Sequence, residues 1–177
     1  MKHARRWMRC SVTFIACTAI SGTVHAQMTG NTVQVGRRVA SFLQPGLSGP
    51  LTAAIIYEPG DDASEREARL IERELISETA GASLRFKPRR VSADALNGLA
   101  GASIAFVTKG ANYRQVAAAT AARSMLTISS DPACARSGYC TVAIQSSPKV
   151  QIIVSRAACI AAGIRFSAAF LMLVREI

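Results

Sequence analysis

The chain has 177 residues, a formal net charge of +10 and half of its residues hydrophobic, enough length and apolar content to bury a real core. Its two histidines, His3 and His25, both lie near the start. If that segment is removed, no imidazole remains, which excludes Ser-His-Asp and Cys-His catalytic sites and zinc sites containing histidine.

The first 26 residues have the order of a secretory signal peptide. Four basic residues among the first nine precede an uncharged apolar stretch, 11–24, and small residues follow at Val24 and Ala26. The stretch is too short to span a bilayer, so we expect cleavage after Ala26 and export to the periplasm. A lipoprotein acylated at Cys17 is a weaker alternative, because the apolar run before this cysteine is short.

The expected mature chain, 27–177, keeps 17 basic and 11 acidic residues, a net charge of +6, and it keeps three of the five cysteines. Its first half alternates helical and extended patterns. The expected elements are a helix within 27–50 ended by Pro45-Gly46, a strand at 51–57, a helix at 61–81, a strand at 83–91 near a sheet edge, a short helix at 92–101 and a strand at 103–108.

The helix at 61–81 has the clearest pattern. Ser64 and Glu67 have the spacing of a capping box, and Gly81 is a typical end. The pair Glu65–Arg69 belongs on a solvated face. We therefore attribute the acidic side chains of this helix to capping and solvation rather than to a site.

The second half predicts further strands and helices: a helix at 112–122, strands at 124–130, 139–145 and 149–155, and a helical end at 156–177 broken at Gly163. Ser146-Ser147-Pro148 suggests a hairpin between the last two strands. In the final segment, one face carries Phe166, Phe170, Leu173, Val174 and Ile177. The pattern predicts one α/β domain, 27–177, with a mostly parallel sheet, helices on both faces in a three-layer sandwich, and a late antiparallel hairpin.

The stretch "DPACARSGYC" carries Cys134 and Cys140 with five residues between them. Exported thiols tend to pair, and three cysteines without histidine do not complete a zinc site, so we predict a structural disulfide and no metal. Cys159 lies in an apolar helical segment and is expected to be a buried, inert thiol, with intermolecular pairing as the alternative.

Charged side chains suggest two further candidates. A basic cluster is a solvated strand edge or a patch for an anionic partner; its members are Arg85, Lys87, Arg89 and Arg90. Nucleic acid is not expected, since no aromatic residues are interleaved. Asp131 ends a strand, where α/β folds often place ligand groups, but a turn or capping role is favoured.

No phosphate-binding motif is present, so no cofactor is expected. A hydrolase that pairs a serine with Lys87, Lys109 or Lys149 has no motif to support it, and no catalytic residue is predicted.

Residues 122–177 resemble the YfiR-like family of small periplasmic regulators. Several elements carry the resemblance: a strand with Thr127, Ser129 and Asp131, a loop with Gly138, and a segment with Ser155, Ala157, Ala158, Gly163, Ile164, Phe166, Ser167 and Leu171. The segment 99–107 resembles the family's preceding strand. The chain departs from the family at Ala102 and Ser103, where many members have a cysteine, at Gly138-Tyr139-Cys140, and in lacking an aromatic-Trp-Pro element near the start.

The resemblance implies a non-enzymatic regulator that restrains a membrane-bound diguanylate cyclase through its periplasmic domain, and so modulates cyclic di-GMP signalling. A late disulfide belongs to that pattern. Phe166, Phe170 and Leu171 are then candidate partner contacts, and a homodimer is left open. No later segment is apolar for long enough to span a membrane. The alternative is a periplasmic domain that binds a small ligand at the strand ends around Asp131.

Overall fold

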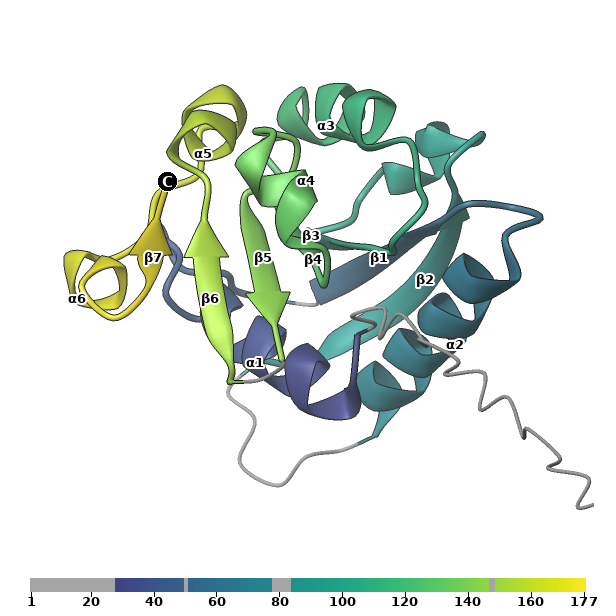
Figure 1. Ribbon diagram of the computed structural model, residues 1–177, viewed down its shortest axis with the longest axis horizontal. Helices are drawn as coiled ribbons and strands as arrows, with labels where there is room; N and C mark the ends of the chain where they lie inside the picture. Colours follow the sequence, from purple (N-terminus) through teal and green to yellow (C-terminus); the bar gives the residue numbers. More distant parts are fainter. Residues whose placement is uncertain (1–27, 50, 78–83, 147–148) are drawn as a thin grey trace, which may run out of the picture.

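The computed structural model describes residues 28–49, 51–77, 84–146 and 149–177 (Figure 1). The predicted signal peptide, the predicted helix end at Gly81 and the turn at Ser147-Pro148 lie outside these residues. Within them, no helix combines the length and the apolar character needed to cross a bilayer.

The described residues build one sheet in the order β2-β1-β3-β4-β5-β6-β7. Its strands are β1 (Leu51–Tyr57), β2 (Phe86–Ser92), β3 (Ile104–Val107), β4 (Leu126–Ser129), β5 (Val142–Gln145), β6 (Gln151–Val154) and β7 (Arg175–Glu176). Neighbours run parallel except β5 and β6, which form the predicted antiparallel pair. The α/β fold class is confirmed.

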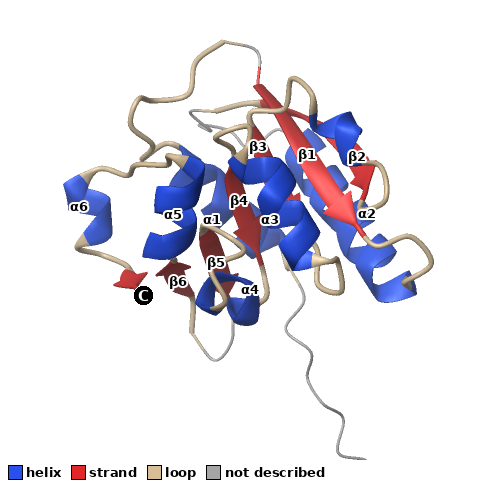
Figure 2. Cartoon of the chain, turned by 90° about the horizontal axis from the view of Figure 1, so that it is seen from above, coloured by secondary structure: helices blue, strands red, loops and turns tan. Residues whose placement is uncertain are grey.

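Helices cover both faces of the sheet (Figure 2). They are α1 (Gly30–Ala40), α2 (Asp62–Ile76), the 3-10 helix η1 (Leu96–Leu99), α3 (Tyr113–Ala121), α4 (Pro132–Arg136), α5 (Arg156–Ala162) and α6 (Ala168–Leu171). Successive side chains of β1 face opposite sides of the sheet: Ile55 packs with α1 and α2, and Ile56 packs with η1 and α3. This alternation follows from the two-residue period of a strand.

Two local predictions were wrong. The cap of α2 is Asp61, whose Oδ1 accepts from the backbone N–H groups of Ala63 and Ser64 at 2.8 and 3.2 Å. Glu67 is buried instead of capping. The chain after Leu171 leaves the helical path to form β7, which pairs with β6, so the predicted C-terminal helical face does not exist as one surface.

Phe166 and Phe170, predicted as partner contacts, are core residues. They are 8% and 3% exposed, and the ring of Phe170 stacks on Phe42 with centroids 4.9 Å apart. A backbone hydrogen bond joins the segments that carry Phe42 and Phe166: the N–H of Gln44 donates to the carbonyl of Arg165 at 2.8 Å. Burial of these rings stabilises the fold and removes them from the surface, while Leu171 is half-buried.

Arg37 is a buried cation on α1, 6% exposed. Its Nη2 donates to the carbonyl of Leu84 at 3.0 Å, and its Nε and Nη1 have no partner within the described part of the chain. A buried charge without an acidic partner costs desolvation energy. We expect Arg37→Met to leave the free energy of unfolding unchanged or to raise it by up to about 2 kcal/mol in urea denaturation.

Arg37→Ala serves as the comparison, because it removes the charge together with the packing of the aliphatic stem. We expect this change to lower the free energy of unfolding by about 1–3 kcal/mol. A loss of similar size for Arg37→Met would show that the guanidinium itself stabilises the fold.

Candidate functional site

The strand order creates a crevice at the carboxyl ends of β1 and β3. The chain leaves β1 through α2 to reach β2 on one side, and then continues through η1 to β3 on the other side of β1. At such a switch point the connections diverge, and the carboxyl ends of the two strands leave room for a ligand.

A cleft of about 650 Å³ lies at this switch point. The segments that follow β1, β3 and β4 meet there, together with the first turns of α2. The cleft is lined by Asp61, Ala63, Arg66, Glu67, Lys109, Gly110, Ala111, Tyr113 and Asp131. This is the position where α/β sheets commonly bind small molecules.

Glu67 holds the inner wall of the cleft together. Its side chain comes from the second turn of α2, and the residue is 4% exposed. One carboxylate oxygen, Oε1, accepts from the N–H of Met28 at 2.8 Å and from the hydroxyl of Ser130 at 2.7 Å. The other, Oε2, accepts from the N–H of Lys109 at 2.9 Å. Three separate segments are therefore fixed to one buried carboxylate.

A second polar network supports the floor of the cleft. The Thr108 hydroxyl donates to the carbonyl of Ile56 at 3.0 Å, and it lies 2.6 Å from the hydroxyl of Ser64. The Ser64 hydroxyl in turn accepts from the N–H of Glu58 at 2.8 Å. These bonds connect the ends of β1 and β3 to the start of α2, so the lining residues are held on rigid elements.

Gly110 allows two walls of the cleft to approach closely. Its φ of +95° lies in the region that favours glycine, and a Cβ there would lie 2.6 Å from Oδ2 of Asp61. A larger residue would strain the loop after β3 and displace the cap of α2. The sequence "TKG" after a buried strand is the local pattern that permits this approach.

Tyr113 and Asp131 form the opposite wall. The phenol donates to Oδ2 of Asp131 at 3.0 Å, while Oδ1 of Asp131 accepts from the N–H of Ala133 and caps α4. Burial, and after it the negative charge of Asp131, raises the pKa of the Tyr113 phenol well above its ordinary value. The hydroxyl therefore stays protonated and keeps donating across the physiological pH range.

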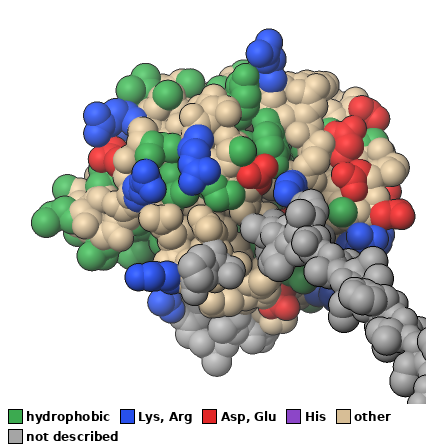
Figure 3. Space-filling model, in the orientation of Figure 1, with side chains coloured by type: hydrophobic (Ala, Val, Ile, Leu, Met, Phe, Trp, Pro, Cys, Tyr) green, Lys and Arg blue, Asp and Glu red, His purple; other side chains and the backbone are tan. Residues whose placement is uncertain are grey.

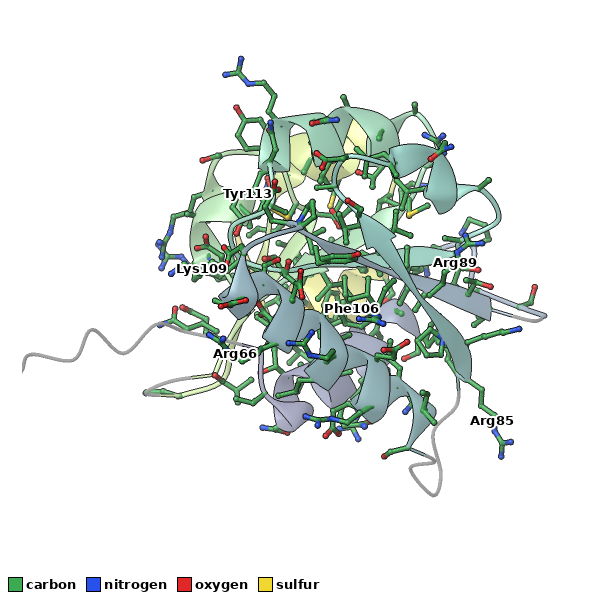
Figure 4. All side chains as sticks on the ribbon, turned by 90° about the vertical axis from the view of Figure 1, so that its right-hand side faces the viewer. Arg66, Arg85, Arg89, Phe106, Lys109 and Tyr113 are labelled. Carbon is green, nitrogen blue, oxygen red and sulfur yellow. A yellow bond between two sulfur atoms is a disulfide. The ribbon has the colours of Figure 1, made fainter. Side chains whose placement is uncertain are left out.

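Figure 4 shows Arg66, Lys109 and Tyr113 along the same side of the molecule. The cleft thus offers the two cationic groups of Arg66 and Lys109 beside the carboxylates of Asp61 and Asp131. A cleft lined by groups of both signs and by an aromatic residue can bind a small molecule that carries both an ammonium and an anionic group. Within the described residues, no cluster of acidic and cysteine side chains could hold a metal ion.

The predicted capping role of Asp131 is confirmed, because its carboxylate caps α4. The residue also lines the cleft, and its role in binding a ligand stays a prediction. Lys109, considered only as a partner for a serine, lies in the cleft with its amide bonded to Glu67. Sequence reasoning missed Glu67 and Tyr113. Tyr113 could have been identified from its position: it is the first residue of α3, directly after the cap Asn112, in the helix that follows the carboxyl end of β3.

The structure contains the predicted disulfide between Cys134 and Cys140. It joins the short helix α4 to the segment just before β5, and both cysteines are fully buried. Because the cleft residue Asp131 caps α4, which carries Cys134, the disulfide stabilises the helix that follows this part of the lining.

Cys159 has a free, buried thiol, as predicted. Burial, with a smaller effect of Glu176, raises its pKa to about 11. A thiol with such a pKa is almost entirely protonated at neutral pH and is a poor nucleophile.

The predicted basic cluster follows the edge strand β2 and its approach, where its four members are exposed: Arg85, Lys87, Arg89 and Arg90. Arg90 Nε lies 3.2 Å from a carboxylate oxygen of Glu72, and Arg89 donates to the carbonyl of Ala100 at 2.6 Å. In Figure 4 this edge lies on the opposite side from Lys109 and Tyr113, so the cluster does not belong to the cleft. Binding of an anionic partner there stays a prediction.

No protein-family model matches the sequence, and no curated protein matches it. Solved structures share the fold. The chain is similar to an ABC domain in complex with L-Trp from Streptococcus pneumonia, at 10% identity and a TM-score of 0.61, over 82% of this chain and 60% of that one.

Two further structures are similar over about the same extent. One is a ligand-free, open substrate-binding protein with adhesive properties from Clostridium difficile, at 9% identity and a TM-score of 0.62, over 85% of this chain and 60% of that one. The other is a conserved domain protein from Vibrio cholerae O1 biovar El Tor, at 10% identity and a TM-score of 0.57, over 81% of this chain and 59% of that one. The chain therefore spans about 60% of the length of these structures, and the likeness establishes the α/β fold.

Proposed function

We propose that this protein is an exported binding protein that binds a small molecule in the cleft at the carboxyl ends of β1, β3 and β4. The observation that carries the proposal is the position of the cleft, at the switch point between β1 and β3, where its lining includes charged groups of both signs.

The chemistry of the lining favours a zwitterion with the size of an amino acid. Asp61 and Asp131 are suited to an ammonium group, and Lys109 and Arg66 to a carboxylate, with the ring of Tyr113 beside them. The similar ABC domain is described in complex with L-Trp, which supports an amino acid as the ligand class.

The site is suited to binding without chemical conversion. Glu67, the buried carboxylate of the lining, already accepts three hydrogen bonds. Carboxylates that are occupied in this way position the walls of a cleft, whereas a general base needs an oxygen directed at the substrate's proton.

Export is supported by the disulfide and by the composition of the first 26 residues. The bond between Cys134 and Cys140 is of the kind that persists in an oxidising compartment. Substrate-binding proteins that work outside the cytoplasm meet this condition, and the similar Clostridium difficile protein is described as adhesive.

The test is a thermal unfolding screen of the protein from Gln27 onward against the common amino acids. A ligand present at about 100 times its Kd adds about 2.7 kcal/mol to the free energy of unfolding, so we expect Tm to rise by about 5–10 °C. Lys109→Ala and Asp131→Asn should each abolish most of this rise, because each removes a charged group from the cleft.

Lys87→Ala is the matched control, since it removes an exposed cation from the edge strand β2, which lies on the opposite side from Lys109 and Tyr113 in Figure 4. It should leave the ligand-induced rise intact. A rise that persists in Lys109→Ala and Asp131→Asn, or no rise with any amino acid, would contradict the proposal.

Regulation of a membrane-bound diguanylate cyclase stays a prediction from the resemblance to YfiR-like proteins. One described feature is compatible with it, the late disulfide between Cys134 and Cys140. Binding or inhibition of a cyclase encoded beside this protein, measured with the purified periplasmic domain, would support that function, and it would be compatible with ligand binding in the cleft.

A further inference from the structure

A second cavity lies far from the cleft, at the end of the sheet formed by β6 and β7. It measures about 270 Å³, and its lining combines apolar groups with charged ones. The apolar part comes from α5, α6 and the segment between them: Cys159, Ile160, Ile164, Phe166 and Leu171. Arg156, Arg165 and Glu176 also line it.

Large apolar side chains stand exposed beside this cavity. Ile160 is 75% exposed, Met172 86% and Leu173 82%. We call these three residues, with Leu171, the α5–α6 face. Figures 1 and 2 both show α6 at one end of the molecule, away from the other helices, and Figure 3 shows apolar side chains gathered at that end. Side chains this exposed contribute little to the core, so packing of the fold does not explain why they are apolar.

Positive charge accompanies this apolar end. Residues 149–177 carry four basic side chains and one acidic one, Glu176. Arg156 Nη2 lies 3.5 Å from the Glu176 carboxylate, which offsets that one negative charge. Arg165 and Arg175, both exposed, flank the exposed pair Met172 and Leu173 in the sequence.

We propose that the α5–α6 face binds the surface of an anionic membrane. Met172 and Leu173 enter the interfacial layer, and Arg165 and Arg175 meet lipid phosphates. Apolar insertion combined with cationic attraction is the usual basis of reversible binding at a membrane surface. Two adjacent, highly exposed apolar side chains suit a deformable lipid layer better than they suit a protein surface, which requires complementary shape.

This inference does not depend on the ligand of the cleft, and it is tested separately. The protein from Gln27 onward contains every described element and lacks the apolar leader, whose own affinity for lipid would hide the effect. Its binding is measured by co-sedimentation with vesicles of equal parts phosphatidylcholine and phosphatidylglycerol, and with vesicles of phosphatidylcholine alone. We expect binding to the anionic vesicles only, weakened by added salt.

The double variant Met172→Asp/Leu173→Asp should reduce binding at least about tenfold, because it places two carboxylates at the anionic surface. Both side chains are exposed, so its thermal unfolding should match that of the wild type. Ile76→Asp is the control: Ile76 is 63% exposed but lies at the end of α2, and this change should leave binding almost intact. Arg165→Gln/Arg175→Gln should also weaken binding.

Three results would overturn the inference. One is no binding of the wild-type protein to anionic vesicles at low salt. Another is equal binding by the Met172→Asp/Leu173→Asp variant and the wild type. The third is conversion of a wild-type dimer to a monomer by that variant, measured by light scattering, since the face would then serve a second copy of the chain.

Discussion

Glu67→Ala is expected to lower the free energy of unfolding by about 3–5 kcal/mol. The change leaves the donors of Met28, Lys109 and Ser130 without their shared acceptor, in a site where Glu67 is 4% exposed. Hydrogen bonds to a charged acceptor contribute more than neutral ones, and unpaired buried donors cost desolvation energy. Urea denaturation measures the loss, and Tm should fall by about 6–20 °C.

Glu65→Ala is the matched control on the same helix. Glu65 is paired with Arg69 at 3.3 Å on an exposed surface, where an ion pair contributes at most about 1 kcal/mol. Glu67→Gln should lie between the two, because an amide accepts through one oxygen only and its NH2 group would face a donor. Equal, small losses for Glu67→Ala and Glu65→Ala would show that Glu67 does not join the segments of the cleft.

Removing the disulfide by Cys134→Ala/Cys140→Ala should cost about 2–3 kcal/mol of stability. The bond closes a short loop between residues separated by six positions, and it connects α4 to the buried segment before β5. Because Asp131 caps α4, the variant should also weaken ligand binding in the cleft. A chemical denaturation curve and a ligand titration of the same variant measure the two effects.

Thiol counting checks the bond itself. In denaturant, the protein from Gln27 onward should show one reactive thiol, Cys159, before reduction and three after it. Three thiols before reduction would mean that the bond is absent, and the stability loss of the double variant would then need another cause.

The order of elements could be predicted from the sequence because hydrophobic periodicity and local stop signals determine it. β1 at Leu51–Tyr57 has the predicted bounds, since an apolar run is bordered there by residues that favour turns. The C-terminal end could not be predicted in the same way. Residues after Leu171 have a helical pattern, but pairing with β6 depends on a contact between segments 22 residues apart, between Ile153 and Arg175.

The cleft was predicted only in part, through Asp131 and its position at the end of a strand. Glu67 was assigned to a capping box because Ser64 and Glu67 have the right spacing, and spacing cannot show which acceptor the helix start uses. Asp61 took the capping role, which left Glu67 free to turn inward. The three donors that Glu67 binds come from positions 39, 42 and 63 residues away, so only the folded chain brings them together.

We propose above all that a small charged molecule binds at the carboxyl ends of β1, β3 and β4. The most direct measurement is a map of backbone amide chemical shifts during titration with the amino acid that raises Tm. We expect the largest shifts at Lys109, Gly110, Tyr113 and Asp131, with none at Met172 or Leu173. Shifts confined to the α5–α6 face, or no shifts at the four cleft residues at saturating ligand, would contradict this proposal.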